Sequence, residues 1–280
     1  MTAVLLALAS AALFGAMTVA VRLGLLRMPD VRLGAAATAF VAFGVALAAT
    51  PFGSGETNVR DLALFALAGL LAPGVSQLLF TLAVRDAGAA RASVIVGAAP
   101  LVTVALGLLV LDEPFELALL AGAALIVAGG TALAWERLRP ESFRAVGMVW
   151  AIGCTLLFAS RDTFVRWFSG ETPVASTAGA AATLFGGSLV LGLLALRAPW
   201  RRALPFVPAG LCFGLSYVFL FEAYYRGRVT VVSPLVATES LWGVGLSALL
   251  LGRSELVGRR LVLGALLIVA GGALIGARAG

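Results

Sequence analysis

The chain has 280 residues, of which 61% are hydrophobic and only 12% are charged, and its mean hydropathy is +1.05. A soluble domain is typically about half apolar and about a quarter charged, so this composition indicates an integral membrane protein made mostly of spanning helices. The sequence contains no histidine, and all 20 of its basic residues are arginine. Histidine catalysis, zinc ligation by histidine and Schiff-base chemistry on lysine are therefore excluded.

The cysteines and the net charge exclude further classes of function. Cys154 and Cys212 both lie in apolar runs, where a buried thiol behaves as a small hydrophobic group. They indicate neither a disulfide framework nor a metal site. The formal net charge of +6 would suggest a nucleic-acid partner for a soluble protein. In a membrane protein this excess is expected in the loops, where it sets the orientation, so no nucleic-acid partner is expected.

Ten segments are long and apolar enough to cross about 30 Å of hydrocarbon, which requires roughly 17 to 25 residues each. The expected spans are Ala3–Val21, Leu33–Ala49, Leu62–Val84, Val94–Leu111, Leu117–Trp135, Val146–Phe168, Val174–Leu196, Leu204–Tyr225, Val229–Leu251 and Leu261–Ala277. All of them should be helices, because lipid cannot satisfy the backbone of an open sheet edge. Every connection is short, so no separate soluble domain is expected.

The sequence repeats itself after about 140 residues, as self-comparison shows. Gly122–Gly130 recurs as Gly264–Gly272 with eight identities in nine positions, and Gly-Val-Ser76-Gln77 matches Gly-Leu-Ser216-Tyr217. Leu13–Arg22 likewise matches Leu157–Arg166, and Glu113 matches Glu255. Chance similarity between apolar helices could explain one match, but not four matches in the same order. The sequence therefore predicts two five-helix repeats, residues 1–136 and 144–280, joined by a charged connection.

The odd number of helices in each repeat determines how the repeats are related. Because five is odd, the second repeat enters from the opposite face, and the expected fold is an all-α integral membrane protein with ten transmembrane helices in two inverted five-helix repeats. Inverted repeats are a recurring architecture of secondary transporters, with the binding site near the midplane at the repeat interface. Gly129-Gly130 and Gly271-Gly272 predict close contact between the fifth and tenth spans, since small residues let helices approach.

These residues also carry a resemblance to a known family. Two repeats that close on Leu-Leu-Val-Leu-Asp-Glu113 and on Gly122–Gly130 resemble the drug/metabolite transporter superfamily, EamA type. Ala83–Leu101 also resembles the passage from the third to the fourth helix of that family. The resemblance covers essentially the whole chain and implies a transporter of small metabolites; in length the chain is similar to the YddG-like amino-acid exporters. The second half departs from the pattern at Trp242, which the repeat alignment places opposite Pro100.

The arginines predict the orientation in the membrane. Most of them fall in the first, third, fifth, seventh and ninth connections. Positively charged loops stay cytoplasmic, so these connections are predicted to be cytoplasmic and both termini non-cytoplasmic, in a bacterial-type inner membrane. Two inverted repeats already enclose a central site, so the protein is expected to function as a monomer in the lipid bilayer.

Three ionisable residues lie inside the predicted spans: Arg161, Asp162 and Glu239. Such residues cost at least a few kcal/mol each and usually face a cavity or pair with one another. Arg161 and Asp162 are adjacent and point about 100° apart on a helix, so they are not expected to neutralise each other. Arg161 could bind a substrate carboxylate, and Glu239 could bind an amine or carry a coupling proton. The alternative is an ion pair between Arg161 and Glu239 that only joins the repeats.

Aromatic residues complete the predicted site, because a cavity lined by rings favours flat or apolar substrates and can hold a cation. The predicted substrate-binding residues are Gln77, Phe80, Phe158, Arg161, Tyr217, Phe221, Glu239 and Trp242. Packing or lipid contact is the alternative for the phenylalanines, whereas Gln77, Tyr217 and Trp242 carry polar atoms that are unfavourable in lipid. Glu113 and Glu255, at the ends of spans, are expected to cap helices or to lie at the interface.

Taken together, these features favour a secondary transporter that exports small metabolites, most readily amino acids, by alternating access. The sequence has no nucleotide-binding motif, so a gradient of an ion or of substrate should drive transport, and no cofactor, metal or catalytic residue is expected. The alternatives are an exporter of drugs or other organic solutes, an intramembrane enzyme acting on lipids, and a channel or scaffold. An enzyme would need clustered acids, histidines or a nucleophile, and the charges of this chain are scattered.

Overall fold

The computed structural model describes residues 2–53, 55, 58–110, 117–136, 142–227, 229–252 and 255–276, and every regular element in these ranges is a helix. Six helical stretches within them are long and apolar enough to cross a membrane. They are Thr2–Arg27, Val31–Phe52, Val59–Ala87, Val146–Ser169, Ser176–Leu194 and Leu204–Arg226. Shorter apolar helices accompany these six, so the fold is helical as the composition predicts.

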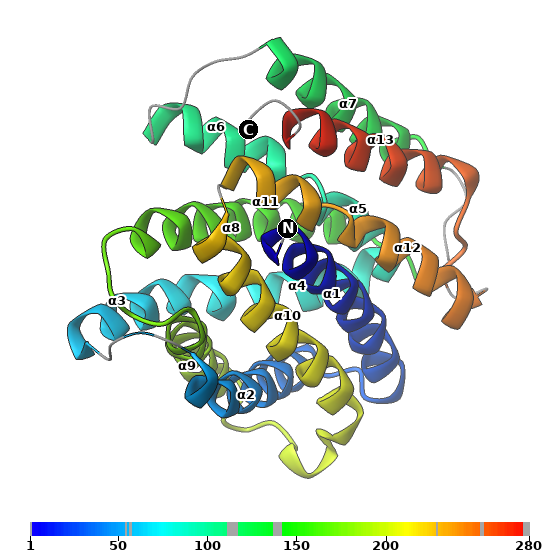
Figure 1. The fold of residues 1–280 in the computed structure, drawn as a ribbon. Helices are drawn as coiled ribbons and strands as arrows, with labels where there is room; N and C mark the ends of the chain where they lie inside the picture. The colour runs from blue at the N-terminus through cyan, green and yellow to red at the C-terminus, as the bar shows by residue number, and fades with distance from the viewer. Residues whose placement is uncertain are drawn as a thin grey trace.

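The helices follow one another with short connections (Figure 1). The first half contains α1 (Thr2–Arg27), α2 (Val31–Ala49), α3 (Val59–Gly69), α4 (Ser76–Ala87), α5 (Ala89–Val96), α6 (Ala99–Val110) and α7 (Leu117–Ala134). The second half contains α8 (Val146–Ser169), α9 (Ser176–Leu194), α10 (Val207–Arg226), α11 (Val229–Val236), α12 (Glu239–Leu250) and α13 (Arg259–Gly276). A π-helical segment, Leu70–Val75, joins α3 to α4 around Pro73, which has no backbone N–H to donate.

Local signals fix several helix starts. Asp30 precedes α2, and its carboxylate accepts a hydrogen bond from the Leu33 amide at 3.0 Å. Asn58 caps α3 in the same way through the amide of Arg60, also at 3.0 Å. A side-chain oxygen at this position satisfies one of the amide groups that a helix start leaves without a partner.

The fourth and ninth predicted spans are each interrupted in the structure, and the two interruptions are turns of the same kind. In the first, the amide of Ala98 donates to the Ile95 carbonyl at 3.1 Å between α5 and α6. In the second, the amide of Thr238 donates to the Leu235 carbonyl, again at 3.1 Å, between α11 and α12. The two turns lie 140 residues apart, the distance that also separates the starts of α5 and α11.

This register corrects one prediction. At a spacing of 140 residues, Ser240 and not Trp242 stands opposite Pro100. Pro100 lacks a backbone N–H, which accounts for a break in the first of these helices. Ser240 keeps its N–H and donates it to the Ala237 carbonyl at 3.1 Å, and its hydroxyl donates to the same carbonyl at 2.8 Å. Ser240 thus stabilises, between α11 and α12, the same kind of turn that Pro100 imposes between α5 and α6.

The predicted contact between the glycine-rich helices is confirmed, since α7 and α13 lie side by side along one edge of the molecule (Figure 1). A Cβ atom built on Gly129 would lie 2.6 Å from the Gly264 carbonyl oxygen, and one on Gly271 would lie 2.5 Å from the Gly122 carbonyl oxygen. Real Cβ atoms do not come this close, so these positions require glycine. Gly130, by contrast, faces open space.

Candidate functional site

A small enclosed cavity lies where the two interrupted helices meet α1, α8 and α10. Its volume is about 20 Å³, which is enough for about one water molecule. Its lining residues are Ser10, Phe14, Val96, Ala99, Phe158, Arg161, Asp162, Ser216, Leu220, Val236 and Glu239. The wall therefore combines residues from both halves of the chain with the turns that interrupt the two helices.

The cavity is symmetric in position but not in charge. Val96 and Val236 are 140 residues apart and line it from the same place in each broken helix, as do Ala99 and Glu239. Yet all three ionisable residues in the described lining come from the second half. Two similar halves thus enclose a site whose charges are supplied by one of them.

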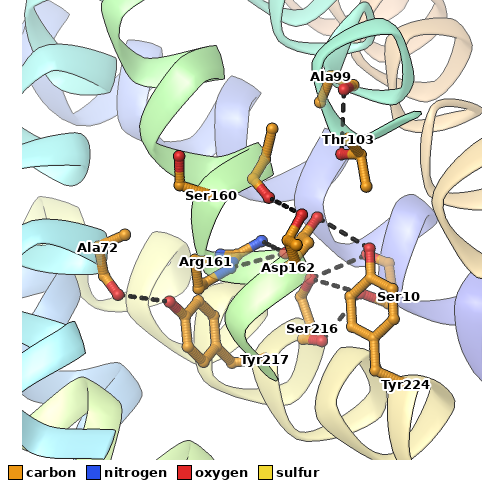
Figure 2. Close-up of polar contacts among 12 residues, drawn as sticks. Ser10, Ala72, Ala99, Thr103, Ser160, Arg161, Asp162, Ser216, Tyr217 and Tyr224 are labelled. Carbon is orange, nitrogen blue, oxygen red and sulfur yellow. Dashed lines mark hydrogen bonds and ion pairs between the residues drawn. The ribbon is translucent and has the colours of Figure 1, made fainter. Parts of the chain in front are cut away.

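Arg161 and Asp162 form an ion pair at the centre of this site (Figure 2). The Arg161 Nε donates to the Asp162 carboxylate at 2.8 Å, and the Tyr224 hydroxyl donates to the other oxygen of that carboxylate at 2.8 Å. The prediction that these neighbours do not neutralise each other was therefore wrong. It considered only the directions in which adjacent side chains leave the helix, whereas the long arginine chain curves back to its neighbour.

Two aromatic rings enclose the Arg161 guanidinium. Its central carbon lies 4.7 Å from the centroid of the Phe158 ring and 4.9 Å from that of Tyr217. A guanidinium at these distances is attracted to the negative face of each ring, most strongly where water is excluded. The Tyr217 hydroxyl donates to the Ala72 carbonyl at 3.4 Å, in the segment where the backbone departs from helical geometry (Figure 2).

Glu239 lies apart from this ion pair. It is the first residue of α12, its exposed fraction is 5%, and it lines the cavity. Within the part of the chain that the structure describes, its carboxylate has neither an ion-pair partner nor a hydrogen-bond partner, so the alternative of an Arg161–Glu239 ion pair is not what the structure contains. The amide groups of the first turn of α12 offer it partial compensation, because a helix start carries partial positive charge.

Three other predicted site residues, Phe80, Phe221 and Gln77, do not line the cavity. Phe80, on α4, packs its ring 5.3 Å from that of Phe14, so it supports a residue that lines the cavity. Phe221 stacks on Tyr217 with a centroid separation of 5.3 Å. Gln77 is fully buried, and neither its amide oxygen nor its amide nitrogen has a hydrogen-bond partner among the described residues.

Trp242 is not brought into contact with the cavity. Its side chain is 49% exposed, and it lies one turn beyond Glu239 on α12. A Cβ atom built on Gly15 would lie only 2.5 Å from the Trp242 Cβ, so its backbone packs tightly on α1. A role for Trp242 in substrate binding stays a prediction.

Three residues that the sequence reasoning did not assign to the site belong to it. Ser10 donates its hydroxyl to the Ser216 carbonyl at 2.9 Å, and Ser216 donates its own to the Ser10 carbonyl at 3.0 Å, which joins α1 to α10 (Figure 2). Tyr224 holds Asp162, as described above. Ser216 carried a signal, because it is a matched position of the repeat. Tyr224 lies near the end of the predicted span Leu204–Tyr225, and nothing in the sequence indicated its contact with Asp162.

A second group of buried charges lies at one end of the bundle, and we refer to Arg22, Arg91 and Glu255 as the Glu255 network. The Arg22 Nε lies 2.9 Å from the Glu255 Oε1, in ionic contact but without the angle of a hydrogen bond. The Arg91 Nη1 donates to the Glu255 carbonyl at 2.9 Å. The other carboxylate oxygen accepts the amide of Ala90 at 3.3 Å, so Glu255 caps α5 from the opposite half of the chain, as a capping role predicts.

Burial raises the pKa of the Glu255 carboxyl above its usual value, and the Arg22 guanidinium opposes that rise. The amides of Ala89 and Ala90 and the Arg91 guanidinium oppose the rise as well, so several groups around this carboxyl favour its charged form. Arg22 also explains why α1 extends past the predicted end at Val21 to Arg27, since its charge is neutralised inside the protein. Glu113, which was expected to have a similar role, lies outside the described residues.

A larger hollow of about 630 Å³ lies between α2, α3 and α9. Its wall is made of residues such as Phe43, Leu62 and Phe185, and none of the described residues that line it is ionisable. Size alone would favour this hollow, but its described lining offers no charged group that could bind the ammonium or carboxylate group of a solute. The small central cavity, with its three ionisable residues, is therefore the candidate site.

Comparison with known proteins identifies the class. The EamA-like transporter family matches residues 1–134 and again residues 145–277. Because these matches span most of the chain, the protein belongs to the EamA-like transporter family, and it is a multi-pass membrane transporter of small solutes. Such transporters are typically not enzymes.

A solved structure supports the same fold. The chain is similar to a protein of known crystal structure with a TM-score of 0.68 and 19% sequence identity, over 97% of this chain and 95% of that one. At this level of identity the likeness concerns the fold alone. No curated protein matches the sequence.

Proposed function

We propose that the protein exports small organic solutes across the inner membrane by alternating access, and that amino acids are the leading substrate class. The observation that carries this proposal is the placement of Arg161, Asp162 and Glu239 around one cavity at the interruptions of two helices. Substrate sites of secondary transporters lie near the midplane, where discontinuous helices meet. Ionisable residues at such depth are functional by default, because they are otherwise costly.

The chemistry of the cavity suits an amino acid. The Glu239 carboxylate can accept an ammonium group, since no residue of the described chain pairs with it. Arg161 has five N–H donors and gives only some of them to Asp162, so the remaining N–H groups can bind a carboxylate. The rings of Phe14 and Phe158 in the same wall can pack against an apolar or aromatic side chain.

Alternating access requires closures that open in turn, and the Glu255 network is our candidate for one of them. It joins α1 and α5 of the first half to the segment before α13 in the second. We further propose that the two halves are inverted repeats. Arg22 donates to the Val84 carbonyl and Arg166 to the Tyr224 carbonyl, each at 3.2 Å, and these pairs occupy matching positions in the two halves. With the odd-numbered connections in the cytoplasm, the Glu255 network would close the cytoplasmic end.

Counterflow in liposomes tests this function. Purified protein is reconstituted into liposomes loaded with one unlabelled compound at a time, and uptake of its labelled form is measured for leucine, phenylalanine, lysine, succinate and tetraphenylphosphonium. We expect uptake of at least one amino acid above that of protein-free liposomes. Arg161→Ala should abolish it, and Ser160→Ala should not, because Ser160 is the exposed neighbour on α8.

The same panel separates the alternatives. Counterflow of tetraphenylphosphonium without any amino acid would replace the amino-acid proposal by export of drugs or other organic cations. Absence of counterflow for every compound, from protein that is folded and correctly inserted, would refute the proposed function.

A further inference from the structure

The charges of the central cavity do not balance. Arg161 and Asp162 neutralise each other, and the second oxygen of Asp162 is satisfied by Tyr224. Glu239 carries a third charge, and no residue in the described part of the chain forms an ion pair or a side-chain hydrogen bond with its carboxylate. The described lining therefore holds a net charge of −1 when Glu239 is ionised.

No charged group on the helices around Glu239 removes this imbalance. Towards it, α8 presents the Arg161–Asp162 pair and the thiol of Cys154, which is buried. The side chains that α1 and α5 contribute to the cavity wall are Ser10, Phe14 and Val96, which carry no charge. On α10, the hydroxyl groups of Tyr217 and Tyr224 donate to the Ala72 carbonyl and to the Asp162 carboxylate, so neither of them donates to Glu239. The two arginines of α13, Arg259 and Arg260, are exposed at its start. They follow the end of α12, whereas Glu239 is the first residue of α12.

An isolated carboxylate in a membrane interior is unfavourable, so it is stable only with a proton or with a cation at contact. A zwitterionic amino acid brings no net charge and leaves the imbalance in place. A solute with net charge +1 removes it, because its ammonium group can contact Glu239 while the Arg161–Asp162 pair stays intact. The net charge of the cavity thus favours solutes of net charge +1 over zwitterionic amino acids.

We propose that Glu239 binds a proton and the ammonium group of a net-cationic amine in turn, so that the protein exchanges one for the other. This inference rests on the proposed function and names the substrate class of the same site. When the amine enters, the Glu239 carboxyl group releases its proton and pairs with the ammonium. When the amine leaves, a proton rebinds to the carboxylate. No bond other than that to the exchanged proton forms or breaks, and no oxidant or reductant is required.

The position of Glu239 suits this exchange. Glu239 is the first residue after the turn that separates α11 from α12. At this turn the chain is not held by a continuous series of helical hydrogen bonds. The cavity of about 20 Å³ has room for an ammonium group but not for a whole amino acid. Binding of the rest of the solute therefore requires the broken helices to separate, which moves Glu239 at the step at which it changes partner.

The experiment compares lysine, which has net charge +1, with norleucine, which has the same carbon chain but no second ammonium group. Detergent-solubilised protein in weak buffer is titrated with each compound, and a pH-sensitive dye reports proton release. We expect about one proton released per lysine bound, none with norleucine, and at least tenfold weaker binding of norleucine. In liposomes with an imposed lysine gradient, net lysine movement through the same protein should be accompanied by proton movement in the opposite direction.

Glu239→Gln is the decisive variant, and Glu171→Gln is its control because Glu171 is an exposed carboxylate on a loop. Glu239→Gln should remain folded, bind lysine at least tenfold more weakly and release no proton, whereas Glu171→Gln should behave as the parent protein. Proton release that persists in Glu239→Gln, or equal binding of norleucine, would overturn the proposal.

Failure of this inference can be told apart from failure of the proposed function. Counterflow of amino acids without proton exchange would refute the role of Glu239 and leave the transporter function in place. Proton release on lysine binding without any counterflow would support the site and refute the transport proposal.

Discussion

Arg22 and Glu255 lie 2.9 Å apart although more than two hundred residues separate them in the sequence, and both side chains are buried. Arg22 belongs to α1, and Glu255 stands in the segment before α13, so this ion pair joins the two halves of the chain. Glu255 also accepts the amide of Ala90 at the start of α5. A single carboxylate therefore fixes one long helix and one half of an interrupted helix.

Removal of one partner of this pair should destabilise the protein strongly. Arg22→Ala leaves the Glu255 carboxylate buried without its counter-charge, which costs about 3 to 5 kcal/mol. The double change Arg22→Ala with Glu255→Gln removes the stranded charge and should recover part of that loss. Unfolding of the purified variants in detergent measures both. Arg226→Ala serves as the control, since its i,i+4 contact with Glu222 lies near the surface and contributes about 0.3 to 0.5 kcal/mol. Equal losses for Arg22→Ala and Arg226→Ala would contradict the structural importance of the buried pair.

The Arg161–Asp162 pair permits a sharper test, because the two candidate partners of Arg161 predict different rescues. Arg161→Ala strands Asp162 and should also cost about 3 to 5 kcal/mol. Addition of Asp162→Asn should restore most of that stability, while addition of Glu239→Gln should not. A double-mutant cycle on thermal unfolding measures this coupling. Rescue by Glu239→Gln alone would show that Arg161 pairs with Glu239 and not with its neighbour.

Two adjacent glycines of α7 should respond differently to the same substitution. Gly129→Ala places a Cβ atom 2.6 Å from the Gly264 carbonyl oxygen, so α7 and α13 must separate. Gly130→Ala meets open space, and alanine is favoured over glycine in a helix by roughly 0.5 to 1 kcal/mol. We expect a lower melting temperature for Gly129→Ala and an unchanged or higher one for Gly130→Ala. Similar destabilisation by both would mean that this contact does not depend on Gly129.

Much of the fold could be predicted because lipid leaves the backbone few choices. Long apolar runs predicted helices, and the recurrence of Gly122–Gly130 as Gly264–Gly272 predicted the contact between α7 and α13, which the close approach of Gly129 to Gly264 confirms. The interruptions within the fourth and ninth spans were not predicted. Hydropathy averaged over a whole span does not register a local turn, although Pro100 follows the first interruption and the polar Thr238, Glu239 and Ser240 follow the second.

The site was predicted less completely, for a related reason. Membrane depth is enough to single out Arg161 and Glu239, because a charge there needs an explanation. Which groups pair cannot be read from depth, since it depends on how a flexible side chain curves and on which helices meet. The pairing of Arg161 with Asp162 was therefore not predicted. The reciprocal hydrogen bonds of Ser10 and Ser216 were not predicted either, because a serine hydroxyl can bond to a carbonyl of its own helix as readily as to one of a neighbouring helix.

The proposed orientation can be checked with single cysteines in a background without Cys154 and Cys212. Glu171→Cys lies in the connection after α8, an even-numbered connection, and should react with an impermeant thiol reagent in intact cells. Arg201→Cys lies in the arginine-rich connection after α9 and should react only after the membrane is permeabilised. Both positions are exposed, so access is governed by the side of the membrane. The opposite pattern of labelling would reverse the proposed topology and place the Glu255 network at the outer end.

The crossing of α5 and α12 offers the last prediction, because these two half-helices come from different halves of the chain and both lead to the cavity. A Cβ atom on Gly243 would lie 2.0 Å from the Ser93 Oγ and 2.5 Å from the Ser93 Cβ. Gly243→Ala should therefore push α12 away from α5, displace Glu239 from the cavity wall and reduce counterflow at least tenfold. Gly245→Ala is the matched control, since it lies on the same helix with open space around it. If the contact with Ser93 is the cause, the added change Ser93→Gly should restore counterflow to Gly243→Ala. Loss of transport in both glycine variants, or no rescue by Ser93→Gly, would show that the α5–α12 crossing does not position Glu239.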